Sequence, residues 1–329
     1  MTELPGRVAV VGAGVIGGAW ASRWLMRGVD VSVSDPSPDA RRIVATVLDN
    51  ARVAWARMGL SPETEGTLTM ASSVGDAVEG AVMIQESAPE NVEIKRSVYA
   101  EIEAACADDA VIASSTSGIK PTQLQGEMRL PERLVVGHPF NPVYLLPMVE
   151  VVGGTETAAS TIEQAMALYT AAGMRPLHVK VEIDAFIADR LLEAVWREAL
   201  WLVNDGVATT EEIDDAIRFG FGLRWGQMGL FETYRIAGGE AGFGHFIKQF
   251  GPTLAWPWTK LMDVPELTDQ LVDELETQSD AQSGMHSIRE LERIRDNNLV
   301  DMMLALEKNQ WGAGEVLARL RNTAVPTVQ

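Results

Sequence analysis

The fold is decided by residues 7–17, which read RVAVVGAGVIG. The first five residues form a short apolar run, which is typical of a buried strand. The next six match the pattern Gly-x-Gly-x-x-Gly, and residues 19–26 continue as a helix. In such a turn, Gly12 permits the tight bend, Gly14 lets a pyrophosphate approach the backbone, and Gly17 lets the helix pack on the strand. The stretch therefore predicts a strand–turn–helix unit that holds a dinucleotide at a helix N-terminus.

A second strand is expected over residues 29–34, and it ends at Asp35. An acid at this distance from the glycine turn accepts hydrogen bonds from the adenosine ribose hydroxyls. Its negative charge would repel a 2′-phosphate. The combination of strand, glycine turn, helix and acid therefore predicts NAD, in preference to NADP, as the cofactor.

Further apolar runs continue the pattern of alternating strands and helices. Strands are expected at residues 81–86, 110–113, 133–136, 148–152 and 175–179, and helices at 39–58 and 160–172. From Ile183 on, the sequence predicts helices alone, with a Gly-, Met- and aromatic-rich loop at 221–231 and polar helices over about 265–321. We expect an α/β fold: a Rossmann-type doubly wound sheet domain over residues 1–183, followed by an all-helical C-terminal domain over 184–329.

Composition excludes several classes of protein. The chain has 329 residues, a net charge of −19 and 47% hydrophobic residues. An acidic chain lacks the basic face that nucleic-acid binding needs, so its charge fits a solvated surface. The single cysteine, Cys106, cannot form an intrachain disulfide, and no Cys/His spacing indicates a metal site. Without a signal segment or an apolar run of about 18 residues, we expect a cytoplasmic protein that does not interact with membranes.

Residues 137–142, which read GHPFNP, follow an apolar run and contain one of four histidines. Because the prolines disfavour helix and central strand, we expect His138 to lie on a stiff turn at the tip of a strand. Glu150 lies within the apolar run 148–152, where a buried carboxylate needs a partner. An imidazole held by a carboxylate is suited to act as a general base. The residues alone also fit a capping histidine and a half-exposed glutamate.

A hydroxyl-rich segment, residues 114–118, follows another expected strand. Hydroxyl groups at the carboxyl end of a parallel strand face the ligand crevice of an open α/β sheet. They also serve as N-caps of a following helix. The residues by themselves leave both interpretations open.

Taken together, these motifs resemble the 3-hydroxyacyl-CoA dehydrogenase family along nearly the whole chain. GAGVIG at 12–17, PEN at 89–91, SSTS at 114–117, GHPFNP at 137–142 and GLFE at 229–232 occur in the family's order. The resemblance implies His138 as catalytic base, Glu150 as its orienting partner, Ser117 as a donor to the reacting oxygen, and Asn141 as a positioning group for substrate and nicotinamide. It also implies a homodimer formed through the second domain, which would bind the substrate. The implied NAD-binding residues are Gly12, Ala13, Gly14, Val15, Ile16, Gly17, Asp35, Glu90 and Lys95.

The chain departs from the family pattern at residues 185–190, which read AFIADR where the family typically has GFIVNR. Asp189 thus stands where an asparagine is usual, and a carboxylate there would disfavour an acyl-CoA or face a cation. Residues 144–147, 231–239 and 256–261 resemble the branch of the family that oxidises the 3-hydroxyl of carnitine. The resemblance therefore implies carnitine as the substrate.

Carnitine carries a quaternary ammonium group, which aromatic faces and a carboxylate can hold. Our candidate substrate residues are Tyr144, Asp189, Trp225 and Phe231. Lys180, Arg190 and Arg224 are open candidates for the substrate carboxylate. Two alternatives remain: a dehydrogenase of a short 3-hydroxy acid or its CoA thioester, and a non-catalytic, crystallin-like NAD-binding protein.

Overall fold

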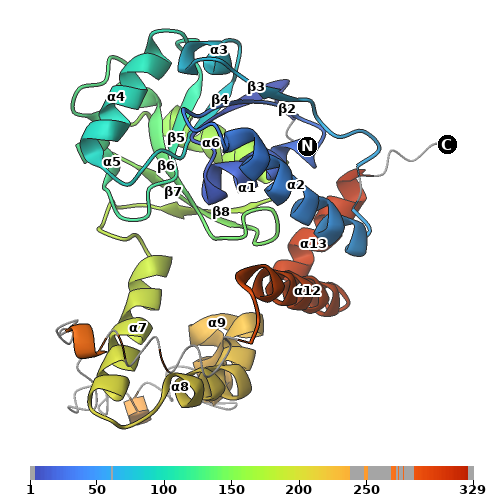
Figure 1. The fold of residues 1–329 in the computed structure, drawn as a ribbon, viewed down its shortest axis with the longest axis vertical. Helices are drawn as coiled ribbons and strands as arrows, with labels where there is room; N and C mark the ends of the chain where they lie inside the picture. The colour runs from blue at the N-terminus through green and yellow to red at the C-terminus, as the bar shows by residue number, and fades with distance from the viewer. Residues whose placement is uncertain are drawn as a thin grey trace. The chain divides into compact units, whose positions relative to one another are not determined.

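The computed structural model describes residues 4–60, 62–237, 248–250, 268–271, 273, 277 and 285–324. The chain divides into two compact units (Figure 1). The first comprises Met1–Ile187 together with Asp296–Gln329, and the second comprises Ala188–Arg295. This division differs from the single boundary after residue 183 that we expected, because the last segment of the chain belongs to the first unit.

The first unit is built on an eight-stranded sheet of order β3-β2-β1-β4-β5-β6-β7-β8. All neighbouring strands are parallel except β6 and β7, which are antiparallel. Because the chain leaves β1 toward β2 and later returns to β4 on its other side, a crevice opens at the carboxyl ends of β1 and β4. The strands are β1 (Arg7–Val11), β2 (Asp30–Ser34), β3 (Leu68–Met70), β4 (Met83–Glu86), β5 (Val111–Ser114), β6 (Leu134–Pro139), β7 (Met148–Gly153) and β8 (Arg175–Val179).

Helices cover both faces of this sheet (Figure 1), and the side chains of β1 are buried on both faces as a result. Val8 and Val10 enter one hydrophobic core, whereas Ala9 and Val11 enter a second core on the opposite face. A strand buried on both faces explains its uninterrupted apolar sequence. The first core is covered by α1 (Val15–Leu25), α2 (Ala40–Arg57) and α6 (Ala159–Ala171), and the second by α3 (Val74–Val78), α4 (Val92–Glu103) and α5 (Pro121–Gln125).

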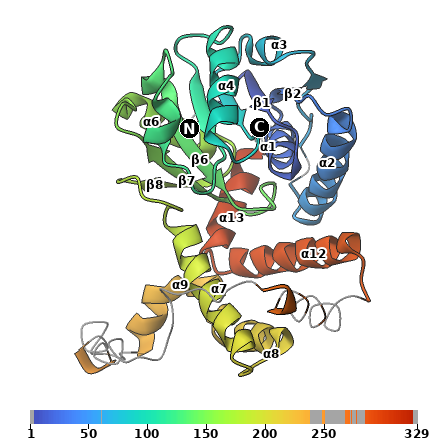
Figure 2. The same cartoon turned by 60° about the vertical axis from the view of Figure 1, so that its left-hand side comes forward.

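The C-terminal helices α12 (Ile288–Glu307) and α13 (Ala313–Ala324) complete the first core. Val300 and Leu317 are fully buried there. Arg57, at the end of α2, hydrogen-bonds to Asn297 and pairs with Asp301 of α12. Figure 2 shows α12 and α13 on the side of the sheet that carries α1 and α2. Few apolar residues of these helices make this contact, and therefore it was not predicted from the sequence.

The second unit contains α7 (Ala188–Asn204), α8 (Thr210–Ala216), a π-helical turn (Ile217–Phe221) and α9 (Gly222–Ala237) among its described residues. Thr209 caps α8 in a capping box with Glu212. Our prediction of a loop over residues 221–231 was wrong, because this segment is helical. Gly220 and Gly229 leave helical geometry and kink the helices there. Glycines are common in loops as well as at helix kinks. The composition of this helical segment therefore resembled that of a loop.

The structure agrees with most of the element boundaries expected for the first unit. The α/β class, with a doubly wound sheet and helices after it, is confirmed. Four short elements, β3, α3, α5 and a 3-10 helical turn (Pro131–Arg133), were not predicted, because each has too few residues to show a period. Helix α7 begins at Ala188, after Phe186, which takes a left-handed backbone conformation with φ of 49°.

Candidate active site

The glycine turn after β1 is shaped by backbone that leaves no room for side chains. A Cβ added to Gly12 would lie 2.5 Å from the carbonyl oxygen of Ser87, and one added to Gly17 would lie 1.8 Å from that of Gly12. Gly12 also has a left-handed φ of 97°. Around Gly14 the space is open, and Gly14 is the N-cap of α1 without a side-chain cap. The turn therefore leaves the first amides of α1 to an anionic group.

Asp35, directly after β2, braces this turn. Its Oδ2 accepts a hydrogen bond of 2.6 Å from the amide of Ala13, and its Oδ1 accepts one of 2.7 Å from the amide of Ser37. Each carboxylate oxygen has a further lone pair, so the ribose-binding role that we predicted is compatible with these bonds.

A groove of about 760 Å³ runs along this part of the sheet edge. Gly12, Gly14 and Asp35 line it, and so do Ser87 and Pro89 beyond β4. A groove with an open glycine, a helix N-terminus and a carboxylate fits a dinucleotide such as NAD. Of the other predicted loop residues, Ala13 is buried, Val15 is exposed, and Ile16 packs against the first core.

Glu90 and Lys95, both predicted to contact the cofactor, lie close together beside this groove. The Lys95 ammonium is 3.6 Å from Glu90 Oε2, and it also donates to the carbonyl oxygen of Ala88 at 3.1 Å. Glu90 Oε1 accepts hydrogen bonds from Thr116 Oγ1 and, at 3.1 Å, from the amide of Ser117. The structure thus joins two predicted cofactor residues to the predicted catalytic Ser117.

Glu86 is a central residue of this cluster that sequence reasoning missed. Its Oε1 accepts a 2.8 Å hydrogen bond from Lys95, and both residues are almost fully buried. Its Oε2 accepts bonds of 2.7 Å from Tyr99 and from Ser114. Burial and the charge of Glu86 raise the pKa of the Tyr99 phenol well above its usual value. A full set of donors stabilises the buried carboxylate.

Gln85, the residue before Glu86, was missed as well. Its Oε1 accepts a 2.7 Å hydrogen bond from Tyr169, and its Nε2 donates to Ser115 Oγ at 2.8 Å. The Ser115 hydroxyl in turn hydrogen-bonds to the hydroxyl of Ser87, and Ser87 lines the groove. The available signal was the presence of two polar residues, Gln85 and Glu86, at the end of an otherwise apolar strand.

His138 and Glu150 face each other across the antiparallel strands β6 and β7, where they are register partners. The distance from His138 Nδ1 to Glu150 Oε2 is 3.0 Å. Glu150 is fully buried and His138 is 5% exposed. Because β6 is parallel to β5, His138 lies at the carboxyl edge of the sheet, two residues beyond the register partner of Ser114. The expected contact between imidazole and carboxylate is therefore present.

The position of His138 corrects one expectation. We placed the histidine on a turn after the strand, whereas β6 continues through Pro139 and includes it. Pro139 is the last residue of the strand, where a missing amide donor is tolerated. The strand backbone, rather than a turn, thus fixes the imidazole opposite its carboxylate.

Aromatic rings and a linker amide enclose this pair. The ring centroid of His138 lies 5.2 Å from that of Phe140 and 5.6 Å from that of Phe186. The amide of Ile187 donates to Glu150 Oε1 at 2.9 Å. This enclosure keeps water from the carboxylate and strengthens its electrostatic interaction with an imidazolium. Asn141, predicted to position the substrate, is exposed two residues after Pro139.

Tyr144 does not lie where a substrate contact was expected. Its ring is 3% exposed and belongs to the first hydrophobic core. Its hydroxyl donates a hydrogen bond to Asp296 of α12. The sequence placed Tyr144 near the histidine but could not show that a helix 152 residues away would take its hydroxyl.

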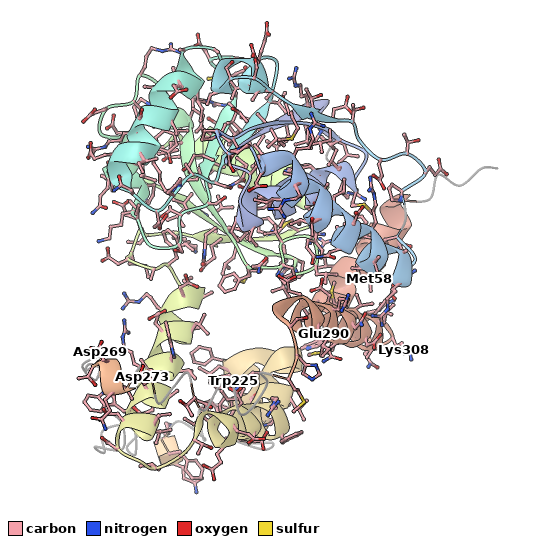
Figure 3. The ribbon with its side chains drawn as sticks, in the orientation of Figure 1. Met58, Trp225, Asp269, Asp273, Glu290 and Lys308 are labelled. Carbon is pink, nitrogen blue, oxygen red and sulfur yellow. The ribbon has the colours of Figure 1, made fainter. Side chains whose placement is uncertain are left out.

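The other predicted substrate residues belong to the second unit. Asp189 lies in the first turn of α7. Trp225, labelled in Figure 3, contacts Phe221 in a tilted arrangement with 4.6 Å between ring centroids, and Phe231 is 70% exposed. The resembling segment at residues 256–261, with its two tryptophans, lies outside the described residues.

No three His, Cys, Asp or Glu side chains within the described ranges are grouped so that they could hold a metal ion. Within the same part of the chain, no helix is both long enough and apolar enough to cross a membrane.

Two family models match this chain. The 3-hydroxyacyl-CoA dehydrogenase NAD binding domain matches residues 7–182, and the C-terminal domain of the same family matches residues 186–287. The family resemblance that we inferred from the motifs is thus confirmed over both halves of the chain.

Curated relatives are similar over nearly the whole chain. An L-carnitine dehydrogenase/betainyl-CoA thioesterase of Ruegeria pomeroyi is 59% identical over 97% of this chain and 66% of its own length. The chain thus spans slightly less than two thirds of that relative. An L-carnitine dehydrogenase of Mesorhizobium japonicum is 56% identical over 94% of this chain and 86% of its own length. An L-carnitine dehydrogenase of Pseudomonas putida is 52% identical over 93% of this chain and 95% of its own length.

Solved structures share the fold. A 5-formyl-3-hydroxy-2-methylpyridine 4-carboxylic acid 5-dehydrogenase, described as an NAD+ dependent dismutase, is similar with a TM-score of 0.78 and 28% identity, over 93% of this chain and 99% of its own. An (S)-3-hydroxybutyryl-CoA dehydrogenase of Ralstonia eutropha is similar with a TM-score of 0.57 and 26% identity, over 65% and 77%.

Proposed function

This chain belongs to the 3-hydroxyacyl-CoA dehydrogenase family, and we propose that it oxidises the 3-hydroxyl of L-carnitine to give 3-dehydrocarnitine, with NAD as cofactor. The observation that carries the chemistry is the buried His138–Glu150 pair at the carboxyl edge of a dinucleotide-binding sheet. The names of the relatives support the choice of carnitine.

His138 acts as the general base. It takes the proton of the substrate hydroxyl as the alcohol becomes a ketone. NAD, when held in the groove beside β1, would supply the acceptor for the hydride that leaves the carbon bearing this hydroxyl. Glu150 Oε2 lies 3.0 Å from Nδ1, and we assign the other ring nitrogen, Nε2, to the substrate hydroxyl. The buried carboxylate also stabilises the imidazolium that forms.

Ser117 and Asn141 orient the reacting group beside this base. Ser117 Oγ lies 3.5 Å from Glu90 Oε1, so one turn can serve both the substrate oxygen and the nicotinamide half of NAD. The Lys95 ammonium, 2.8 Å from Glu86 and 3.6 Å from Glu90, offsets part of the negative charge beside that turn. Fixed donors of this kind reduce the reorganisation that the transition state requires.

The trimethylammonium group of carnitine requires partners that do not rely on hydrogen bonds. Trp225 and Phe231 of the second unit offer aromatic faces, and Asp189 offers a negative charge. The second unit is therefore the part to which we assign substrate binding. The buried ring of Tyr144 argues against its direct contact with the substrate, and we assign it another role below.

A substrate panel tests the reaction. Initial rates of NADH formation are measured with L-carnitine, 3-hydroxybutyrate and 3-hydroxybutyryl-CoA at equal concentrations. We expect L-carnitine to be turned over fastest. Faster turnover of either other compound would replace our proposal with a short 3-hydroxy acid or acyl-CoA dehydrogenase. Binding of NADH without turnover of any of the three would indicate a non-catalytic NAD-binding protein.

We also propose a homodimer formed through the second unit. A largely apolar groove of about 470 Å³ lies between α7 and α8, and Leu191, Leu192 and Trp196 are exposed on α7. Apolar surface of this kind is usually covered by a partner. Light scattering after size exclusion tests the proposal, and the mass of one 35.7 kDa chain would contradict it.

A single cysteine supports a cytoplasmic location.

A further inference from the structure

The segment that joins β6 to β7 connects the strand of His138 to the strand of Glu150. Its backbone is held by two buried side chains, Arg23 and Trp55. Arg23 of α1 donates to the carbonyl oxygens of Val143 at 3.0 Å and Leu146 at 3.3 Å. Trp55 of α2 donates through its indole nitrogen to the carbonyl oxygen of Tyr144 at 2.8 Å.

A third contact comes from the far end of the chain. The hydroxyl of Tyr144 hydrogen-bonds to Asp296, the first residue of the C-terminal segment that belongs to the first unit. Asp296 is 9% exposed, so its carboxylate is held in the core of that unit rather than in solvent. Helices α1, α2 and α12 thus converge on one short segment.

These contacts bury polar and charged groups, which costs free energy. Arg23 is 2% exposed, and burial together with the charge of Arg27 lowers its pKa to about 9. The guanidinium therefore remains charged at neutral pH, and a buried charge is tolerated only when it has strong hydrogen bonds. An ordinary surface loop would satisfy its carbonyl groups with water at no such cost. The arrangement therefore indicates a segment whose position matters.

We propose that Arg23, Trp55, Tyr144 and Asp296 form a clamp that positions Asn141 and the catalytic ends of β6 and β7. The clamp residues are positioning residues, because they act through Asn141, His138 and Glu150. The inference rests on the proposed dehydrogenase function. It also gives the C-terminal helices a part in catalysis, since α12 supplies one of the four side chains.

The test begins with Tyr144→Phe, which removes the hydroxyl and retains the ring. We expect kcat for L-carnitine to fall roughly 5-fold or more, since groups coupled in one network interact by amounts of that size. Binding of NADH, followed by tryptophan fluorescence, should remain unchanged. The primary isotope effect on kcat with substrate deuterated at C3 should rise, because misplacement slows hydride transfer itself. Asp296→Asn should act in the same direction, and the double variant should be no slower than the slower single variant.

Arg57→Gln is the matched control. It breaks the contacts of α2 with Asn297 and Asp301 on the same helix as Asp296 but does not touch the clamp. Its kcat and isotope effect should match the wild type even if its melting temperature falls. An equal loss of kcat in Arg57→Gln and Tyr144→Phe, an unchanged kcat in a folded Tyr144→Phe, or additive effects in the double variant would overturn the proposal.

A spectroscopic measurement separates this proposal from the proposed function. The chain has four histidines, so the imidazole nitrogen resonances can be assigned by substitution. Tyr144→Phe should shift the resonances of His138, whereas Arg57→Gln should leave them in place. If the wild type does not oxidise carnitine but Tyr144→Phe still shifts the His138 resonances, the carnitine reaction is refuted and the clamp is retained. An active wild type whose His138 resonances and kcat are unaffected by Tyr144→Phe would refute the clamp alone.

Discussion

The carboxyl edge of the sheet contains two regions that are built in different ways. The groove beside β1 is formed by backbone, with glycines where side chains would collide. The region around β6 and β7 is formed by buried ionisable side chains, the imidazole and carboxylate of His138 and Glu150. Substitutions should therefore inactivate the two regions in different ways: in the first by steric exclusion of the cofactor, in the second by loss of proton transfer.

The largest effect should come from His138→Ala. We expect kcat to fall at least roughly 100-fold, because general-base groups contribute about 100- to 10,000-fold. The affinity for NADH, measured by fluorescence titration, should change little, since the groove is built from other residues. His178→Ala, on the exposed side of β8, is the control and should retain full activity. Unchanged turnover in His138→Ala would remove the basis of the proposed mechanism.

A large loss of stability should follow Glu86→Gln, which lies between the two regions. The substitution leaves the buried ammonium of Lys95 without its closest carboxylate. Removing one member of a buried ion pair costs about 3–5 kcal/mol in unfolding free energy. Urea denaturation measures this loss. Asp108→Asn breaks an exposed ion pair with Arg129 and should leave the urea midpoint in place; equal midpoints for both variants would contradict the prediction.

Gly17→Ala should damage the backbone-built region alone. The added Cβ would fall 1.8 Å from the carbonyl oxygen of Gly12, so the turn must shift. We expect roughly a 10-fold or greater rise in the KM for NAD, because misplaced amides lose their bonds to the phosphates. Gly18→Ala is a close control, since its Cβ would meet Val47 at an ordinary 3.6 Å. If both variants bind NAD as the wild type does, the steric account of the turn is wrong.

The smallest effect should come from Asp35→Asn. The amide keeps one acceptor for Ala13 but loses the charge that disfavours a 2′-phosphate. We expect the ratio of kcat/KM for NAD to that for NADP to fall several-fold, on the order of the ~1 kcal/mol that a typical hydrogen bond contributes. Asp39→Asn, on an exposed pair with Arg42, should leave the ratio unaltered. A constant ratio in Asp35→Asn would assign cofactor selectivity elsewhere.

The same comparison explains which features the sequence could predict. Residues 7–17 predicted the groove because glycine spacing encodes backbone geometry directly. The contact of His138 with Glu150 was implied by the family resemblance, whereas the residues alone showed only that a carboxylate in an apolar run needs a partner if it is buried. The turn expected at His138 was wrong because Pro139 can end a strand as well as begin a turn.

Long-range contacts explain what could not be predicted. Glu86 looked like the end of a strand, and only the folded sheet brings Tyr99 and Ser114 to its carboxylate. Tyr144 looked like a neighbour of the base, but its hydroxyl goes to Asp296. No local period relates positions so far apart in the chain. The helical segment at 221–231 was misjudged because glycines at kinks resemble glycines in loops.

The return of Asp296–Gln329 to the first unit has a consequence for how the chain is made. A ribosome must synthesise all of Ala188–Arg295 before the residues that cover the first core emerge. At roughly 5–20 residues per second, the nascent sheet waits on the order of ten seconds with Val300 and Leu317 still missing from its side. Until then its unfinished apolar face is a target for chaperones, and translation stalled before α12 should yield aggregation-prone chains.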